Sequence, residues 1–124
     1  MKAGREHRVP LSDAALEVLR RAKALDDNSG LVFPSLYKPG RELSDMTLTK
    51  LLRDLGLADR ATVHGFRTSF KTWYMETTDT PWAVGEAALA HTLGNSTEAA
   101  YARSDLFEKR RTLMQQWGSF VSKA

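Results

Sequence analysis

The chain is organised around the stretch HGFRTSFKTWY, residues 64–74. Its aromatic side chains Phe66, Phe70, Trp73 and Tyr74 recur every three or four positions. That spacing places side chains on one face of a helix. The stretch therefore predicts a helix that buries an aromatic face in a core.

The same stretch contains a His-x-x-Arg pair, His64 and Arg67. Residues three apart lie about one helical turn apart, on the same face. A guanidinium offers a planar fork of donors to two phosphate oxygens, and an imidazole exchanges protons near neutral pH. The pair suits a phosphodiester, although the motif alone arises by chance in about one chain of this length in ten.

Composition excludes several function classes. The 124 residues, 42% of them hydrophobic, predict a single globular domain over residues 1–124. The chain has no cysteine, which excludes disulfides, thiolate zinc sites and a cysteine nucleophile. No apolar run approaches the roughly 20 residues that span a bilayer. A soluble cytoplasmic protein without membrane association is the default expectation.

The charge balance permits a polyanionic partner. The net charge is +3 and the pI about 9.4, which by itself gives DNA binding about one chance in four. Basic residues cluster at the N-terminus, at Lys2, Arg5 and Arg8, and again at residues 109–111.

Residues 2–11 have the pattern of the end of a β-hairpin. Ala3-Gly4 supplies a turn, and Pro10 stops the alternating segment that follows. The first strand of this hairpin would lie almost entirely upstream of Met1. We therefore expect the chain to be a piece of something longer.

The rest of the chain predicts a mainly α fold. Apolar residues at helical spacing, with capping residues before them, indicate further helices over residues 12–25, 44–56, 80–95 and 104–121. In the second of these, Lys50 and Arg53 lie opposite the leucine stripe, either as a solvated face or as contacts to a DNA backbone. His91 falls in the last turn of the helix that begins at Thr80-Pro81.

Four segments together resemble the tyrosine recombinase family, the phage-type integrases. They are Lys2 before RVPLS (residues 8–12), HGFR (64–67), LAHTLGN (89–95) and AAYARSD (99–105). The family has a lysine on a β-hairpin, a His-x-x-Arg, a histidine or tryptophan in a Leu-x-His context and a nucleophilic tyrosine about ten residues later. The resemblance covers nearly the whole chain and is closest to integrases of prophages and genomic islands.

The resemblance implies site-specific recombination of double-stranded DNA through a transient 3′-phosphotyrosyl link. Tyr101 would attack the scissile phosphate, His64 would exchange its proton, and Arg67 would hold the non-bridging oxygens. His91 would add a hydrogen bond to the same phosphate, and Lys2 would protonate the departing 5′-oxygen. Neither a cofactor nor a metal is implied.

The resemblance also implies an incomplete site. The family uses a second active-site arginine upstream of the lysine hairpin, and neither Arg5 nor Arg8 has the context to replace it. We expect the chain to be the C-terminal part of a catalytic domain, inactive alone, whose full-length form is a tetramer on DNA. The candidate DNA-backbone contacts are Arg5, Arg8, Lys50, Arg53 and Arg103.

Three alternatives stay open at this point. The chain could bind DNA without cutting it. It could be a metal-dependent hydrolase using His64 and His91, although their separation of 27 positions and the lack of a His-x-x-x-His motif speak against a metal site. The stripe from Leu106 to Val121 could dock on a neighbouring protomer, although packing in cis is the better expectation.

Overall fold

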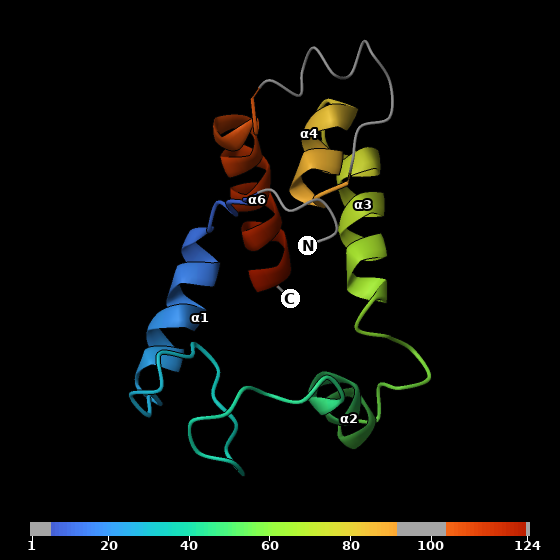
Figure 1. Cartoon of the computed structure of the whole chain (residues 1–124). Coiled ribbons are helices and arrows are strands. Elements are labelled where there is room, and N and C mark those ends of the chain that lie inside the picture. The colour runs from blue at the N-terminus through green and yellow to red at the C-terminus, as the bar shows by residue number, and fades with distance from the viewer. Residues whose placement is uncertain (1–5, 92–103, 124) are drawn as a thin grey trace. The chain divides into compact units, whose positions relative to one another are not determined.

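The computed structural model describes residues 6–91 and 104–123, in which five helices are found (Figure 1). They are α1 (Asp13–Lys23), α2 (Thr47–Asp54), α3 (Gly65–Thr77), α4 (Trp82–Ala88) and α6 (Phe107–Ser122). The only β pairing in these described ranges is an isolated bridge between Pro34 and Glu42. The mainly α prediction is confirmed. Contacts divide the chain into two compact units, residues 15–69 and residues 1–14 with 70–124.

The predicted N-terminal hairpin is not seen in the part of its segment that the structure describes. Residues 6–12 have no strand, and a strand requires a neighbour that accepts its ladder of hydrogen bonds. The predicted turn at Ala3-Gly4 and the candidate Lys2 lie outside the described residues.

In the unit of residues 15–69, α2 has a different start from the predicted one. Its N-cap is Met46, without a side-chain cap. Ser44 is instead used in a preceding turn, where its carbonyl accepts the Thr47 amide at 3.0 Å and its hydroxyl meets the Thr47 hydroxyl at 3.2 Å. The predicted end is confirmed, because Gly56 has a φ of +68° after the last turn.

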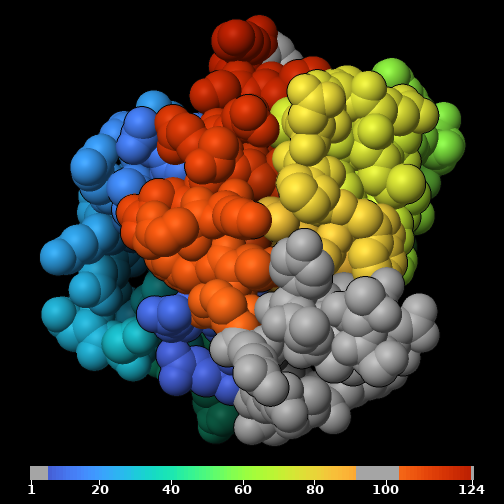
Figure 2. Space-filling view, turned by 90° about the horizontal axis from the view of Figure 1, so that it is seen from above, coloured from blue at the N-terminus to red at the C-terminus, as the bar shows by residue number. Residues whose placement is uncertain are grey.

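The core of the other unit is built where α3, α4 and α6 pack together. The buried residues are Phe70 and Tyr74 of α3, Val84 of α4, Leu89 directly after α4, and Leu113 of α6. Figure 2 shows the atoms of α6, in orange and red, directly against those of α4, in yellow. The predicted aromatic face is thus buried from Phe70 onward.

An aromatic cluster extends this core along α3 and α6. The Phe70 and Trp117 rings meet edge to face, with their centroids 5.4 Å apart. The centroid of the Trp73 ring lies 5.0 Å from that of Trp117 and 5.5 Å from that of Phe120. Such contacts stabilise beyond the area that they bury. The expectation that Phe66 helps to anchor this face is wrong, since its side chain is 54% exposed. Helix α3 packs against α4 and α6 only from Phe70 onward, one turn after Phe66.

Two glycines permit close approaches within this unit. A Cβ on Gly85 of α4 would lie 2.1 Å from the Tyr74 ring, and one on Gly118 of α6 would lie 2.3 Å from the Ser12 hydroxyl oxygen. Any larger residue would therefore force a core ring, or the buried Ser12, to move.

Helix α4 is shorter than the sequence pattern indicates. Pro81 is its N-cap, and the helix ends at Ala88. Ala90 then adopts a left-handed conformation with φ +56°, the Ala90 amide bonds to the Ala87 carbonyl, and the His91 amide bonds to the Glu86 carbonyl. These two bonds form a Schellman motif, which ends a helix. The prediction that His91 lies in the last helical turn is therefore wrong.

Helix α6 begins three residues after the predicted cap. Leu106, with φ +53°, is its N-cap. The Ser104 hydroxyl accepts a hydrogen bond from the Leu106 amide, and the Asp105 carboxylate accepts one from the Phe107 amide. Both side chains thus form turns before the helix, a common alternative to capping for Ser and Asp.

Candidate functional site

The His-x-x-Arg pair lies at the N-terminus of α3. His64 immediately precedes the helix, and its carbonyl accepts a hydrogen bond from the Arg67 amide at 3.1 Å. The Thr62 hydroxyl accepts one from the Gly65 amide at 2.9 Å and so satisfies an otherwise unpaired amide at the helix start. Both predicted side chains are exposed, about one turn apart. A phosphate oxygen could be reached by either.

His91 is held by a carboxylate that no sequence motif indicated. Its Nδ1 lies 2.7 Å from Oε2 of Glu86, a residue of α4 that is only 5% exposed. The other carboxylate oxygen, Oε1, accepts hydrogen bonds from the Tyr74 hydroxyl at 3.1 Å and from Lys71 Nζ at 2.8 Å. We call these four residues the Glu86 cluster. The sequence feature that could have indicated a buried Glu86 is its position as the single acid within the apolar run WAVGEAALA, residues 82–90.

The electrostatics of the Glu86 cluster favour an ionised carboxylate. Burial by itself raises the pKa of Glu86, but hydrogen bonds from Lys71, His91 and Tyr74 outweigh it, and the pKa lies below its ordinary value. Burial, together with the neighbouring Glu86, raises the pKa of Tyr74 to about 12. Tyr74 therefore stays protonated and acts as a donor.

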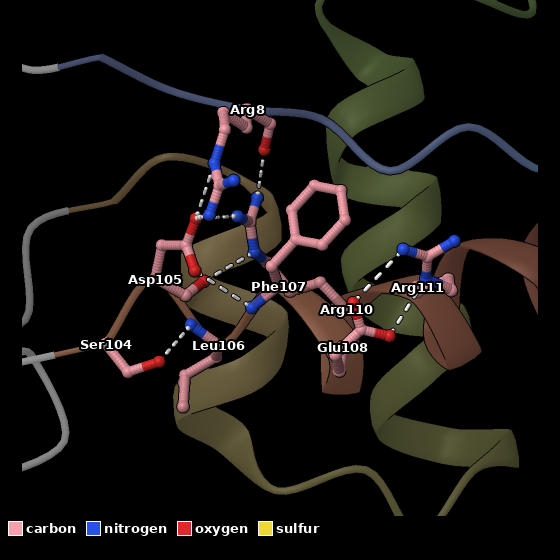
Figure 3. A network of polar contacts seen from close by, with 8 residues as sticks. All are labelled: Arg8, Ser104, Asp105, Leu106, Phe107, Glu108, Arg110 and Arg111. Carbon is pink, nitrogen blue, oxygen red and sulfur yellow. Dashed lines mark hydrogen bonds and ion pairs between the residues drawn. The ribbon is translucent and has the colours of Figure 1, made fainter.

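A second buried charge ties the N-terminal segment to the start of α6 (Figure 3). The Arg110 side chain, 1% exposed, donates to the Asp105 carbonyl from Nε and to the Arg8 carbonyl from Nη1, both at 2.7 Å. Arg8 in turn donates to the Asp105 carboxylate from Nε and Nη2 at 3.1 and 2.6 Å. We call these three residues the Arg110 clamp. Its ion pair holds the pKa of Asp105 below the ordinary value.

The Arg110 clamp changes the interpretation of two predictions. Arg8, a candidate DNA-backbone contact, is engaged with Asp105 and lies 4.8 Å from the centre of the Phe107 ring. Arg110 shares the predicted stripe of α6 with Leu113, and both are almost fully buried in their own unit. Packing of this part of the stripe in cis is thus confirmed, whereas Val121 remains 46% exposed.

The other predicted site residues fall into two groups. Lys50 forms an ion pair with Asp54 one turn along α2, and Arg53 lies in the last turn of the same helix. Lys2, Arg5, Tyr101 and Arg103 lie outside the described residues. His64 and Arg67 belong to the unit of residues 15–69 and His91 to the other.

One surface groove of the described residues is not lined by any of these candidates. It has a volume of about 910 Å³ and is lined by the end of α3, the residues before α4 and one side of α6, including Thr78, Lys109, Gln116 and Lys123. In the described ranges, no three His, Asp or Glu side chains gather as a metal site. None of the described helices is long and apolar enough to cross a membrane.

Comparison with known proteins identifies the family. Residues 1–107 match the phage integrase family. The chain is 40% identical over 124 residues to the prophage integrase IntA of Escherichia coli K12, covering 100% of this chain and 30% of that protein. It is 32% identical to the integrase of enterobacteria phage P4, covering 98% of this chain and 28% of that protein.

The chain matches only part of the length of each relative. The integrase of Shigella phage Sf6 is 27% identical, over 99% of this chain and 32% of that protein. The chain thus spans about a third or less of the length of these relatives. No solved structure gives a significant match. The family match over most of the chain is sufficient, and the chain belongs to the phage integrase family of tyrosine recombinases.

Proposed function

We propose that this chain supplies the nucleophile and most of the phosphate-binding groups of a site-specific DNA recombinase. The observation that carries the proposal is the family match over residues 1–107. That range contains Lys2, the His64–Arg67 pair, His91 and Tyr101 in the order that the family pattern has.

The proposed reaction is a phosphoryl transfer without an external energy source. The Tyr101 oxygen attacks the scissile phosphorus, a 3′-phosphotyrosyl bond forms, and the bond to the 5′-oxygen breaks. His64 takes the phenolic proton, and Lys2 gives a proton to the departing oxygen. Arg67 and His91 stabilise charge on the non-bridging oxygens. The exposure of His64 and Arg67 on one turn supports this assignment, because DNA must reach both.

We also propose that the chain is inactive by itself. The resemblance places a further arginine upstream of Lys2, and losing such a group costs on the order of 10³-fold in rate. In this proposal both compact units belong to the C-terminal portion of one catalytic domain. The complete protein acts in the cytoplasm as a tetramer on its attachment sites.

The test uses a chimera, because the IntA prophage integrase supplies a matched upstream segment. This chain replaces the 30% of IntA that it matches, and the chimera is incubated with a nicked attachment-site DNA that prevents religation. We expect a covalent protein–DNA band from the chimera, none from its Tyr101→Phe variant and none from the 124-residue chain. Trp73 and the rest of the core are untouched by these changes.

The same assay distinguishes the alternative of DNA binding without cleavage. Chimera and chain are also titrated with labelled duplex at rising salt, because affinity that depends on phosphate contacts falls with salt. Salt-sensitive binding without any covalent band, while intact IntA forms one, would overturn the catalytic proposal in favour of binding alone.

A further inference from the structure

The Glu86 cluster divides its hydrogen bonds between the two oxygens of one buried carboxylate. A buried carboxylate is costly unless its oxygens are satisfied. Lys71 and Tyr74 already satisfy Oε1, whereas Oε2 contacts His91 at 2.7 Å. One oxygen is thus held by the core, and the other is aimed at the one residue of the cluster that the family pattern places on the phosphate.

The backbone independently fixes the position of His91. The Schellman motif after α4 returns the chain so that the His91 amide bonds to the Glu86 carbonyl at 3.0 Å. The turn requires Ala90 at φ +56°, a conformation that costs an alanine about 1 kcal/mol or more. Main chain and side chain of the same glutamate therefore both hold this histidine.

We propose that Glu86 is a positioning residue of the recombination reaction, holding the His91 imidazole by Nδ1 so that Nε2 contacts the scissile phosphate. The inference rests on the proposed function, since it assigns His91 to the phosphate. Glu86 itself, 5% exposed beneath the His91 ring, touches neither DNA nor Tyr101 in this assignment.

The position of the proton follows from the charge on Glu86. An ionised carboxylate only accepts hydrogen bonds, so Nδ1 of His91 must carry a proton. A neutral ring then has Nε2 as an acceptor, and a ring that donates to the phosphate from Nε2 is doubly protonated and positively charged. Glu86 compensates that charge from behind. In the proposed contact the His91 ring therefore holds both protons, one shared with Glu86 and one with the phosphate.

Glu86→Gln tests this arrangement without removing the side chain. A glutamine keeps an oxygen for Lys71 and Tyr74 but presents an amide N–H, instead of an oxygen, to His91. The neutral imidazole should then change from the Nδ1–H to the Nε2–H tautomer.

The first measurement needs no activity. Imidazole ¹⁵N shifts of the 124-residue chain are recorded at about pH 8, where an ordinary histidine is neutral. The chain has three histidines, and loss of one set of signals in His91→Gln identifies this ring. We expect the Nδ1–H tautomer in the wild type and Nε2–H in Glu86→Gln. The same tautomer in both proteins would refute the arrangement.

The second measurement asks whether Glu86 acts through His91. In the IntA chimera, single-turnover DNA cleavage is compared among the parent, Glu86→Gln, His91→Ala and the double variant. We expect Glu86→Gln to slow cleavage about 10-fold or more, which corresponds to ~1.4 kcal/mol, with DNA affinity much less affected. In the His91→Ala background the same change should have about a 2-fold effect or less.

The outcomes separate the inference from the function on which it rests. If the parent chimera forms no covalent complex while intact IntA does, the proposed function fails. If the parent cleaves and Glu86→Gln cleaves equally well, or is equally harmful with and without His91, the positioning role fails and Glu86 is structural only.

Discussion

The Glu86 cluster and the Arg110 clamp are two buried charges in one compact unit, and they are neutralised in different ways. The Glu86 carboxylate is held by side chains, from α3 and from the turn after α4. Arg110 donates instead to two main-chain carbonyls, and the Asp105 carboxylate lies farther away, at 3.6 Å. Side-chain partners can be exchanged one at a time, whereas main-chain partners cannot.

The difference indicates different tasks. The Arg110 clamp fixes where two segments run, because its acceptors belong to the backbone at Arg8 and Asp105. In sequence these segments adjoin the candidates Lys2 and Tyr101. The Glu86 cluster fixes how one ring is oriented and protonated. We therefore expect changes to the clamp to affect stability first and changes to the cluster to affect chemistry first.

The largest expected effect is that of Arg110→Met. Methionine fills similar space but donates nothing, so the Arg8 and Asp105 carbonyls lose a charged donor, at a cost of about 3 kcal/mol. Chemical denaturation of the 124-residue chain measures the loss. The matched control is Arg111→Met on the exposed side of α6, where the ion pair with Glu108 is worth less than about 1 kcal/mol. Equal losses in the two variants would contradict the assigned role of the clamp.

Gly85→Ala should disrupt the Glu86 cluster by displacing Tyr74. The new methyl group would overlap the Tyr74 ring, which must move and carry its hydroxyl away from Glu86. We expect a loss of about 2 kcal/mol in the free energy of unfolding, together with a changed His91 ¹⁵N spectrum. Ala83→Gly in the same helix provides the contrast, since it costs about 1 kcal/mol in helix propensity without touching the ring. An unchanged spectrum in Gly85→Ala would mean that Tyr74 does not help to hold Glu86.

Glu86→Gln should alter stability in a pH-dependent way. The folded-state pKa of Glu86 is lowered from 4.5 by its hydrogen bonds, so its contribution is fully present above about 4.5 and is lost as the pH falls through the folded-state pKa. At neutral pH we expect the variant to be less stable by about 1 kcal/mol. The difference should shrink in acid. Asp27 and Asp105, whose pKa values are also lowered, occur in both proteins and cancel. A difference that stays constant with pH would show that the lost charge is not its cause.

The smallest effect is expected from Ala90→Gly, which should stabilise the turn before His91. Glycine adopts φ +56° without the strain that a Cβ causes, which stabilises the folded state. The greater freedom of glycine in the unfolded chain cancels part of this stabilisation. The net gain should be about 0.5 kcal/mol, measured by thermal unfolding, with the His91 tautomer unchanged. Destabilisation would contradict the left-handed turn and with it the main-chain half of the arrangement around Glu86.

The sequence by itself determined the helical fold, the aromatic core and the family. Periodic apolar spacing is a local signal, and it correctly placed α3 and the buried faces at Phe70 and Leu113. Motif order is also a property of the chain alone, which is why the family could be inferred from the segments around His64, His91 and Tyr101.

Only the tertiary structure decided the helix ends and the buried charges. The end of α4 depends on a left-handed alanine, which the propensity of Ala90 for helix conceals. Glu86 and Arg110 look like ordinary surface residues in sequence, because charged side chains are mostly exposed. Their burial becomes favourable only when the fold brings hydrogen-bond donors and acceptors from other segments into contact with them. No local sequence pattern predicts these contacts.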